Sequence, residues 1–230
     1  MKIACIGNSH LWALKGAIRT GLFKSDELEV TFWGTGGLGF DTISYEGGIF
    51  RTPLRDVALK ISDGRYESLP AHEFDAIIFH GILPNVERYL SALRKMSDDI
   101  RRYSRAYLRD GLQTCIEGER PYPLICSLRA DYKRRVLMSA VPLAPEDSAH
   151  FKERPMRCDE FKLVNSCISA ILSDIRAEYV SQPSDTVSDY RYSKREFLKS
   201  DNNIHMNGQY GASVLREIAV QLAVRCDTSN

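Results

Sequence analysis

Short apolar runs recur along the chain, and segments whose apolar residues have helical spacing separate them. The runs that we expect to form strands cover residues 3–6, 28–33, 74–79, 135–141 and 178–181. Each run stops at a glycine, a proline or a polar residue, as buried strands of a sheet commonly do.

Helical periodicity fills much of the chain between these runs. It begins directly after residue 10 and recurs over 85–109, 159–177 and 208–224. Asn207 precedes the last of these segments and is expected to cap it. Strands that alternate with helices predict an α/β fold with a mainly parallel sheet and helices on both of its faces.

Two segments follow this alternation less well. Residues 40–72 are interrupted by glycine and proline, which predicts loop-rich structure, and residues 111–130, with Gly111, Gly118, Pro121 and Pro123, are expected to form an excursion beside the core. We expect one domain over residues 1–230, with a helical or loop excursion beside the core at about 96–130.

Composition narrows the function only a little. Hydrophobic residues make up 43% of the chain and charged residues 27%, and the net charge is +1. This balance gives no field that favours nucleic acid or an anionic membrane as a partner. The apolar run before Asn8 is too short for a signal peptide, and no membrane span is present, so a cytoplasmic location is expected. The cysteines form no CxxC pair and the histidines no HxxxH pair, so no metal or other cofactor is expected.

Ser9 lies where the first strand turns into the first helix, within Gly7-Asn8-Ser9-His10. Backbone N–H groups at such a turn have no helical acceptor, and they can stabilise an oxyanion that forms beside the hydroxyl. Ser9 is therefore a candidate nucleophile, and the alternative is that it only caps the helix.

His205 lies in a polar loop just before the last helix. The final connection of an α/β sheet can reach the carboxyl edge of the strands, where ligands of such sheets bind. His205 is therefore a candidate general base for the Ser9 proton, with a nearby carboxylate to orient its ring. The alternative is a solvated loop histidine.

These residues resemble the conserved blocks of the SGNH hydrolases, the superfamily that includes the GDSL esterases and lipases. Gly7-Asn8-Ser9-His10 resembles the first block, whose serine is the nucleophile, and His205 matches the histidine of the last block. The resemblance implies a three-layer, flavodoxin-like fold. It also implies hydrolysis of an acyl ester through an acyl-enzyme on Ser9.

The resemblance further implies an oxyanion hole and an acidic residue that orients the catalytic histidine. Its donors would be the N–H of Ser9, the N–H of Gly37 and the side-chain amide of Asn85, with Gly36 as the close alternative to Gly37. The spacing from Gly81 to Asn85 is wider than in the family.

In place of the family's aspartate three residues before the histidine stands Asn202, whereas Asp201 lies four residues before His205. We predict that the loop carries one extra residue and that Asp201 is the acid; the alternative is that the acid is absent.

Asn8, His80 and Gly81 are the expected substrate-binding residues, and a packed strand-end position is the alternative for His80. Met206-Asn207 and Tyr210-Gly211 also resemble family members associated with bacterial polysaccharides. The resemblance therefore implies a small-molecule or carbohydrate ester as the substrate, with an O-acyl group on a carbohydrate as the first expectation. An O-acyltransferase with the same serine and histidine, and an inactive glycan-binding or scaffold protein, remain as alternatives. Residues 34–39 read GTGGLG, but the weak helical character of the next residues argues against a dinucleotide site.

Overall fold

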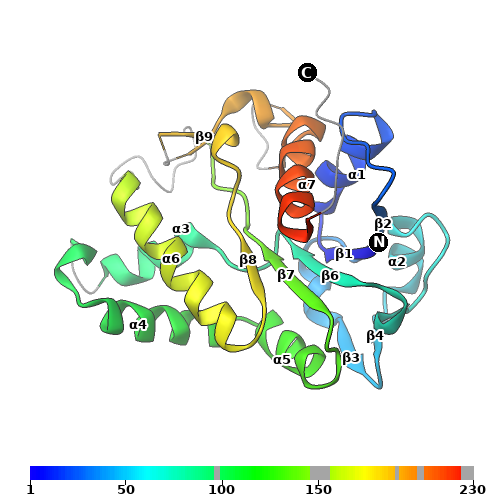
Figure 1. The fold of residues 1–230 in the computed structure, drawn as a ribbon, viewed down its shortest axis with the longest axis horizontal. Coiled ribbons are helices and arrows are strands. Elements are labelled where there is room, and N and C mark those ends of the chain that lie inside the picture. The colour runs from blue at the N-terminus through cyan, green and yellow to red at the C-terminus, as the bar shows by residue number, and fades with distance from the viewer. Residues whose placement is uncertain (96–98, 146–155, 190–191, 201–204, 224–230) are drawn as a thin grey trace.

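The computed structural model describes residues 1–95, 99–145, 156–189, 192–200 and 205–223 (Figure 1). Its centre is a five-stranded sheet in which all neighbouring strands are parallel, in the order β2-β1-β6-β7-β8. The strands are β1 (Lys2–Gly7), β2 (Glu29–Gly34), β6 (Ala76–His80), β7 (Arg135–Ser139) and β8 (Glu178–Val180). The α/β class is thereby confirmed, and the strand order is that of flavodoxin-like sheets.

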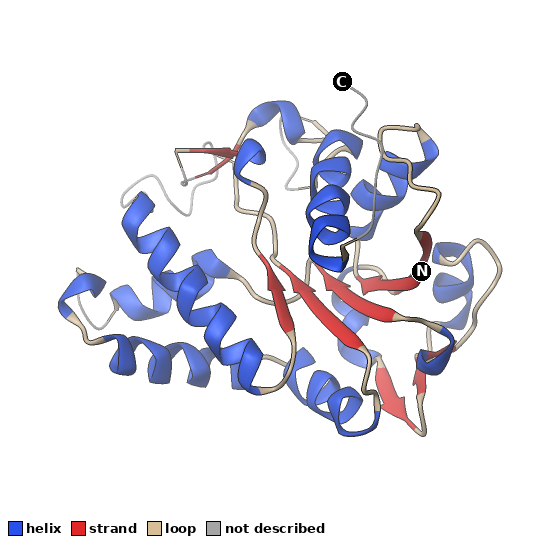
Figure 2. Ribbon diagram, viewed as in Figure 1, coloured by secondary structure: helices blue, strands red, loops and turns tan. Residues whose placement is uncertain are grey.

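Helices cover both faces of this sheet, as Figure 2 shows. On one face, α1 (Leu11–Arg19) and α7 (Gly208–Leu222) pack against residues such as Ile3, Cys5 and Ile78. The other face carries α3 (Val86–Arg94), α4 (Arg105–Glu117), α5 (Pro121–Asp131) and α6 (Cys158–Asp174). Alternate residues of each strand enter the two cores, because successive side chains of a strand point to opposite faces.

Residues 40–72, expected to be loop-rich, contain regular elements, and the excursion expected at residues 111–130 is helical. Residues 40–72 contain α2 (Arg55–Ile61) and an antiparallel sheet of β3 (Ser44–Glu46), β4 (Ile49–Arg51) and β5 (Leu69–Pro70). Residues 111–130 are mostly helical, because α4 continues to Glu117 and α5 follows directly after a short corner. Pro121 is compatible with α5 because it occupies the first turn, where a missing N–H costs no helical bond.

The helical pattern over residues 85–109 predicts one long helix or two, and two are present among the described residues. The structure has α3, then a 3-10 turn at Ile100–Arg102, and then α4. Ser104 caps α4 by accepting a hydrogen bond from Tyr107 N, so the new helix start is encoded locally. The remaining short elements, which include the antiparallel pair β9 (Val187–Ser188) and β10 (Tyr192–Ser193), lie between β8 and α7 in the chain.

Close packing of α1 on α7 depends on Gly211. A Cβ atom at Gly211 would lie 2.0 Å from the carbonyl oxygen of Ala13. We therefore expect Gly211→Ala to lower the free energy of unfolding by about 3 kcal/mol, because the helices must separate. Urea unfolding measures the change.

Gly16 provides the matched control on the facing helix. A Cβ atom at Gly16 meets its nearest neighbour, Gly208 Cα, at an ordinary 3.7 Å. Gly16→Ala should leave the protein as stable or slightly more stable, since alanine favours a helix over glycine. Equal effects of the two substitutions would contradict this account of the interface.

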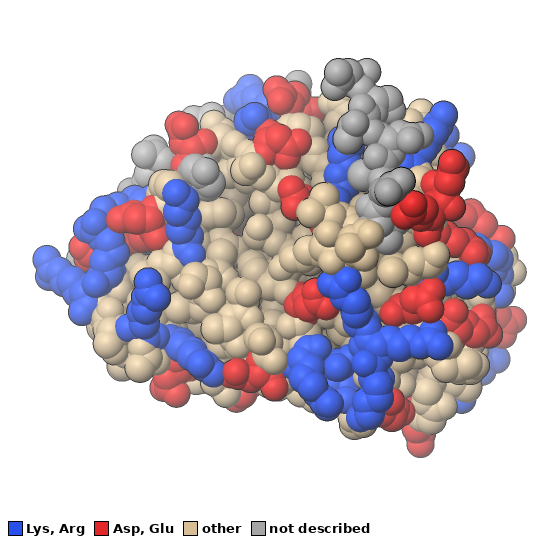
Figure 3. All heavy atoms as spheres, in the orientation of Figure 1, with Lys and Arg blue, Asp and Glu red and all other residues tan. Residues whose placement is uncertain are grey.

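Charges of both signs are mixed on the face shown in Figure 3, with one group of basic side chains along its lower edge. Among the described residues, no helix is long and apolar enough to cross a membrane.

Candidate active site

The candidate site lies at the carboxyl ends of β1 and β6. The chain leaves β1 toward β2 on one side of the sheet and returns to β6 on the other, which makes this edge a topological switch point where α/β sheets bind ligands. Ser9 follows β1 and Gly81 follows β6.

The structure brings Ser9 and His205 together across most of the chain. His205 Nε2 lies 3.0 Å from Ser9 Oγ, within hydrogen-bond distance. The segment around His205 is held by backbone bonds, because Lys199 N donates to His205 O and Asn207 N donates to Phe197 O. Asn207 then caps α7, as expected, by accepting from the N–H groups of Gln209 and Tyr210.

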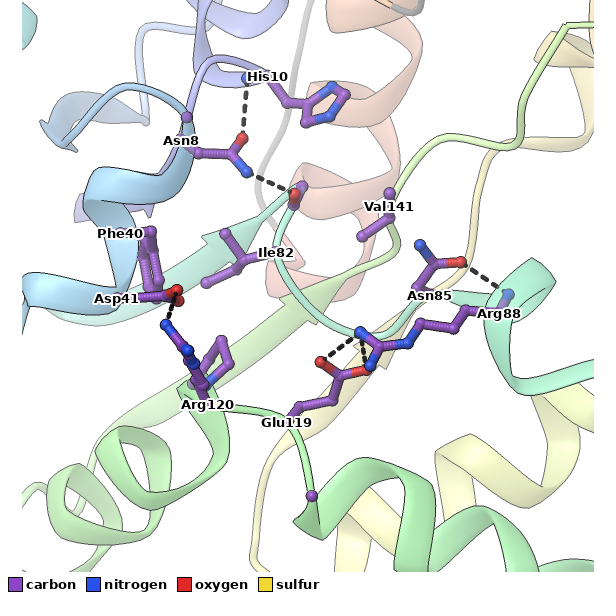
Figure 4. Close-up of a pocket in the computed structure, with 14 residues that line it drawn as sticks. Asn8, His10, Phe40, Asp41, Ile82, Asn85, Arg88, Glu119, Arg120 and Val141 are labelled. Atoms are coloured by element: carbon purple, nitrogen blue, oxygen red, sulfur yellow. Dashed lines mark hydrogen bonds and ion pairs between the residues drawn. The ribbon is translucent and has the colours of Figure 1, made fainter. Parts of the chain in front are cut away.

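Ser9 does not act as the side-chain cap of α1. The cap position is His10, and it makes no side-chain cap bond. Instead, Asn8 Oδ1 accepts from His10 N at 3.0 Å and Asn8 Nδ2 donates to Gly81 O at 3.1 Å. Asn8 therefore ties the turn after β1 to the turn after β6 (Figure 4), and the Ser9 hydroxyl is left for His205.

Gly81 permits the close approach of these two turns. Its φ is +73°, and a Cβ atom there would lie 2.5 Å from His10 Cβ. A side chain at this position would be strained and would push the turn after β6 away from Asn8.

Three candidate oxyanion donors lie near this edge. Within the described part of the chain, the N–H of Ser9 has no hydrogen-bond acceptor. Gly37 begins the 3-10 helix η1 (Gly37–Thr42), so its N–H has no acceptor within that helix. Asn85 caps α3 by accepting from Arg88 N at 3.0 Å through Oδ1, which leaves the Nδ2 amide to donate. Gly36 precedes η1 as its cap residue.

The site adjoins two cavities. The first, of ≈ 500 Å³, is lined by the residues Asn8, His10, Gly37, Phe40, Asp41, Gly81, Ile82, Asn85, Arg88, Gly118, Glu119, Arg120, Pro121 and Val141. The second, of ≈ 470 Å³, is lined by Ser9, Trp12, Gly16, Lys199, His205, Met206, Asn207 and Gly208. The candidate nucleophile and base thus line one cavity, whereas Gly37 and Asn85 line the other.

His10 lies beside residues of both cavities. Its ring centroid lies 5.7 Å from that of His205, and the same residue lines the first cavity. Burial, and next the nearby His205, lower the pKa of His10 to about 4. His10 is therefore neutral at neutral pH and does not oppose a positive charge on His205.

His80 is fully buried and lies on neither cavity wall. Its Nδ1 lies 3.0 Å from Ser139 Oγ on the neighbouring strand. The structure thus places His80 in the core, in the packed strand-end position, and off the lining of both cavities. Burial, and next the nearby His10, lower the pKa of His80 to about 3.

Burial of neutral His80 predicts acid sensitivity. Its pKa is about 3 in the folded chain and about 6.5 when unfolded. Below about pH 6.5 the unfolded chain binds a proton at this histidine before the folded chain does. The free energy of unfolding is therefore highest above about pH 6.5 and falls as the pH falls toward 3. When the pH is lowered from 7 to about 4.5, the free energy of unfolding of the wild type should fall by about 2 kcal/mol more than that of His80→Asn.

Urea unfolding at the two pH values tests this expectation. His72→Asn is the matched control, because His72 is exposed, and it should keep the wild-type pH dependence. An unchanged pH dependence in His80→Asn would show that His80 does not cause the acid sensitivity.

Asp201, the expected acid, and Asn202 lie outside the described residues. Within the described part of the chain, no group of three or more His, Cys, Asp and Glu side chains is arranged to hold a metal ion.

Sequence reasoning missed the charged wall of the first cavity. The corner between α4 and α5 carries Glu119, which pairs with Arg88 at 2.9 Å, and Arg120, which pairs with Asp41 at 2.7 Å (Figure 4). These partners are far apart in the sequence, and the pattern of α4 and α5 gives no sign that their corner faces β6.

Comparison with known proteins gives matches in structure alone. No protein-family model and no curated protein matches the chain.

Several solved structures match over 96% of this chain, among them the following three. A GDSL-like lipase from Bacteroides thetaiotaomicron is 12% identical over 86% of its own chain, with a TM-score of 0.42. The periplasmic domain of a Salmonella Paratyphi A lipopolysaccharide acetyltransferase is 12% identical over 83% of its chain, with a TM-score of 0.42. A carbohydrate acetylesterase family member from Sinorhizobium meliloti is 11% identical over 97% of its chain, with a TM-score of 0.41. At this identity the likeness concerns the fold, and the chemistry must be argued from the site itself.

Proposed function

We propose that this protein is a serine esterase that hydrolyses a small O-acyl ester, with a carbohydrate as the alcohol. The observation that carries the proposal is the 3.0 Å contact between Ser9 Oγ and His205 Nε2 at the switch point of the sheet. A nucleophile within hydrogen-bond reach of a base, beside unused N–H donors, is the arrangement that acyl transfer requires.

In the first step, His205 Nε2 accepts the Ser9 proton while Ser9 Oγ bonds to the ester carbonyl carbon. The negative charge that develops on the carbonyl oxygen is stabilised by the N–H groups of Ser9 and Gly37 and by the Asn85 amide. His205 then returns the proton to the alcohol as the carbon–oxygen bond breaks, which leaves the acyl group on Ser9.

In the second step, His205 removes a proton from water, and the water oxygen attacks the acyl-enzyme. The Ser9–acyl bond breaks, the acid is released and Ser9 is reprotonated. We assign to Asp201 the role of orienting His205 and stabilising its charged form.

A second candidate is O-acyl transfer to another alcohol. The second cavity favours it, because Ser9 and His205 themselves line a space of ≈ 470 Å³ apart from the cavity that holds Gly37 and Asn85. An acceptor bound there would reach the acyl-enzyme in place of water.

Product analysis with mono-O-acetylated sugars tests both candidates. The hydrolase releases acetate at a rate that does not depend on added sugar acceptor, whereas a transferase forms a new acetylated sugar. The absence of both products, together with retained sugar binding, would instead indicate an inactive binding protein.

A further inference from the structure

The first cavity is bounded on one side by two ion pairs that meet at the corner between α4 and α5. Arg120 Nη1 donates to Asp41 Oδ2 at 2.7 Å, and Arg88 Nη1 donates to Glu119 Oε2 at 2.9 Å. Gly118 and Pro121 of the same corner also line the cavity.

These pairs attach the corner to the elements that carry the oxyanion donors. Asp41 belongs to η1, which begins at Gly37. Arg88 lies in the first turn of α3, which Asn85 caps. An ester whose carbonyl oxygen reaches Gly37 and Asn85 therefore has the remainder of the molecule beside this wall.

The arginines face solvent while their partners are more covered. The side chains of Arg88 and Arg120 are 68% and 78% exposed, whereas those of Glu119 and Asp41 are 14% and 29% exposed. Each of these two contacts uses one terminal nitrogen of the guanidinium, and a guanidinium carries five N–H donors. Donors therefore remain for a ligand in the cavity.

The wall as a whole is neutral, because each arginine is matched by a carboxylate. It offers donors and acceptors side by side, which suits hydroxyl groups better than it suits an anion. A purely alkyl group would displace water from the remaining guanidinium donors and offer them no hydrogen bond in return, which is costly. Ile82 and Val141, both half-buried, lie between the wall and Asn8 in Figure 4 and supply an apolar surface for C–H groups.

We propose that the Arg88–Glu119 and Arg120–Asp41 pairs form the subsite for the alcohol part of the ester and select an uncharged, hydroxyl-rich alcohol. This inference rests on the proposed esterase function, and it assigns specificity to the corner between α4 and α5.

The test compares p-nitrophenyl acetate, which has no hydroxyl-rich alcohol, with mono-O-acetylated neutral hexosides and uronosides. Arg88→Ala and Arg120→Ala should lower the ratio of kcat/KM for the hexosides to that for p-nitrophenyl acetate by about tenfold or more. The loss should appear mainly in KM. Arg88→Ala retains the backbone N–H that donates a hydrogen bond to Asn85 Oδ1, so the cap of α3 is kept.

Arg109→Ala is the matched control. Arg109 lies on α4 and pairs with Asp174 on α6, away from the cavity lining, so the ratio should stay at the wild-type value. The subsite is wrong if the Arg88 and Arg120 variants keep that ratio, or if the wild type cleaves p-nitrophenyl acetate but no hexoside. If the wild type prefers uronosides and the Arg88 and Arg120 variants lose that preference, the subsite selects an anionic alcohol and the proposal of an uncharged one is wrong. A wild type that cleaves none of the esters would overturn the proposed function itself, and this subsite with it.

Discussion

Replacing Ser9 by alanine should lower kcat for ester hydrolysis by about 10⁴-fold or more, because the acyl-enzyme has no other hydroxyl on which to form. His205→Ala should cause a loss of similar size, since Ser9 Oγ then has no base at 3.0 Å. The double variant should be little worse than either single variant, because the two side chains act as one unit. Steady-state hydrolysis of p-nitrophenyl acetate measures all three losses.

Ser127→Ala and His72→Ala are the matched controls, since both residues are exposed and lie outside the two cavities. Both should retain wild-type kinetics. Turnover by Ser9→Ala within about tenfold of the wild-type rate would exclude Ser9 as the nucleophile.

Replacing Asn85 should lower kcat by about 100- to 1000-fold, because one donor to the oxyanion is lost. Asn85 also caps α3, so Asn85→Ala should in addition lose about 1 kcal/mol of stability. Asn85→Asp keeps a capping oxygen but replaces the amide donor with a negative charge. It should remain as stable as the wild type while losing at least as much activity as Asn85→Ala.

Ser104→Ala separates capping from catalysis. Ser104 caps α4 by accepting from Tyr107 N and does not line either cavity. This variant should lose stability as Asn85→Ala does, yet keep its kcat. If Asn85→Asp remains fully active, Asn85 is not an oxyanion donor.

The sheet could be predicted from the sequence because its strands are buried on both faces. Runs such as 3–6 and 74–79 are nearly continuous in apolar residues, and they became β1 and β6 with boundaries shifted by no more than two residues. The corner between α4 and α5 could not be predicted, because glycine and proline there mark a helix end and a helix start as readily as a loop.

The candidate site, too, could be predicted only in part. Ser9 and His205 could be singled out because each lies two or three residues before a helix at the carboxyl edge of the sheet, where the topology brings them together. His80 lies at the same edge, but its side chain points into the core, and sequence alone does not distinguish the two orientations. The ion pairs of the cavity wall depend on how α3, η1 and the α4–α5 corner pack, which no local pattern encodes.

Covalent labelling with a fluorophosphonate, followed by intact mass, tests the central claim most directly. The wild type should gain one adduct, Ser9→Ala should gain none, and His205→Ala should gain it far more slowly. No adduct on the wild type, under conditions that label a known serine esterase, would contradict a nucleophilic Ser9 activated by His205.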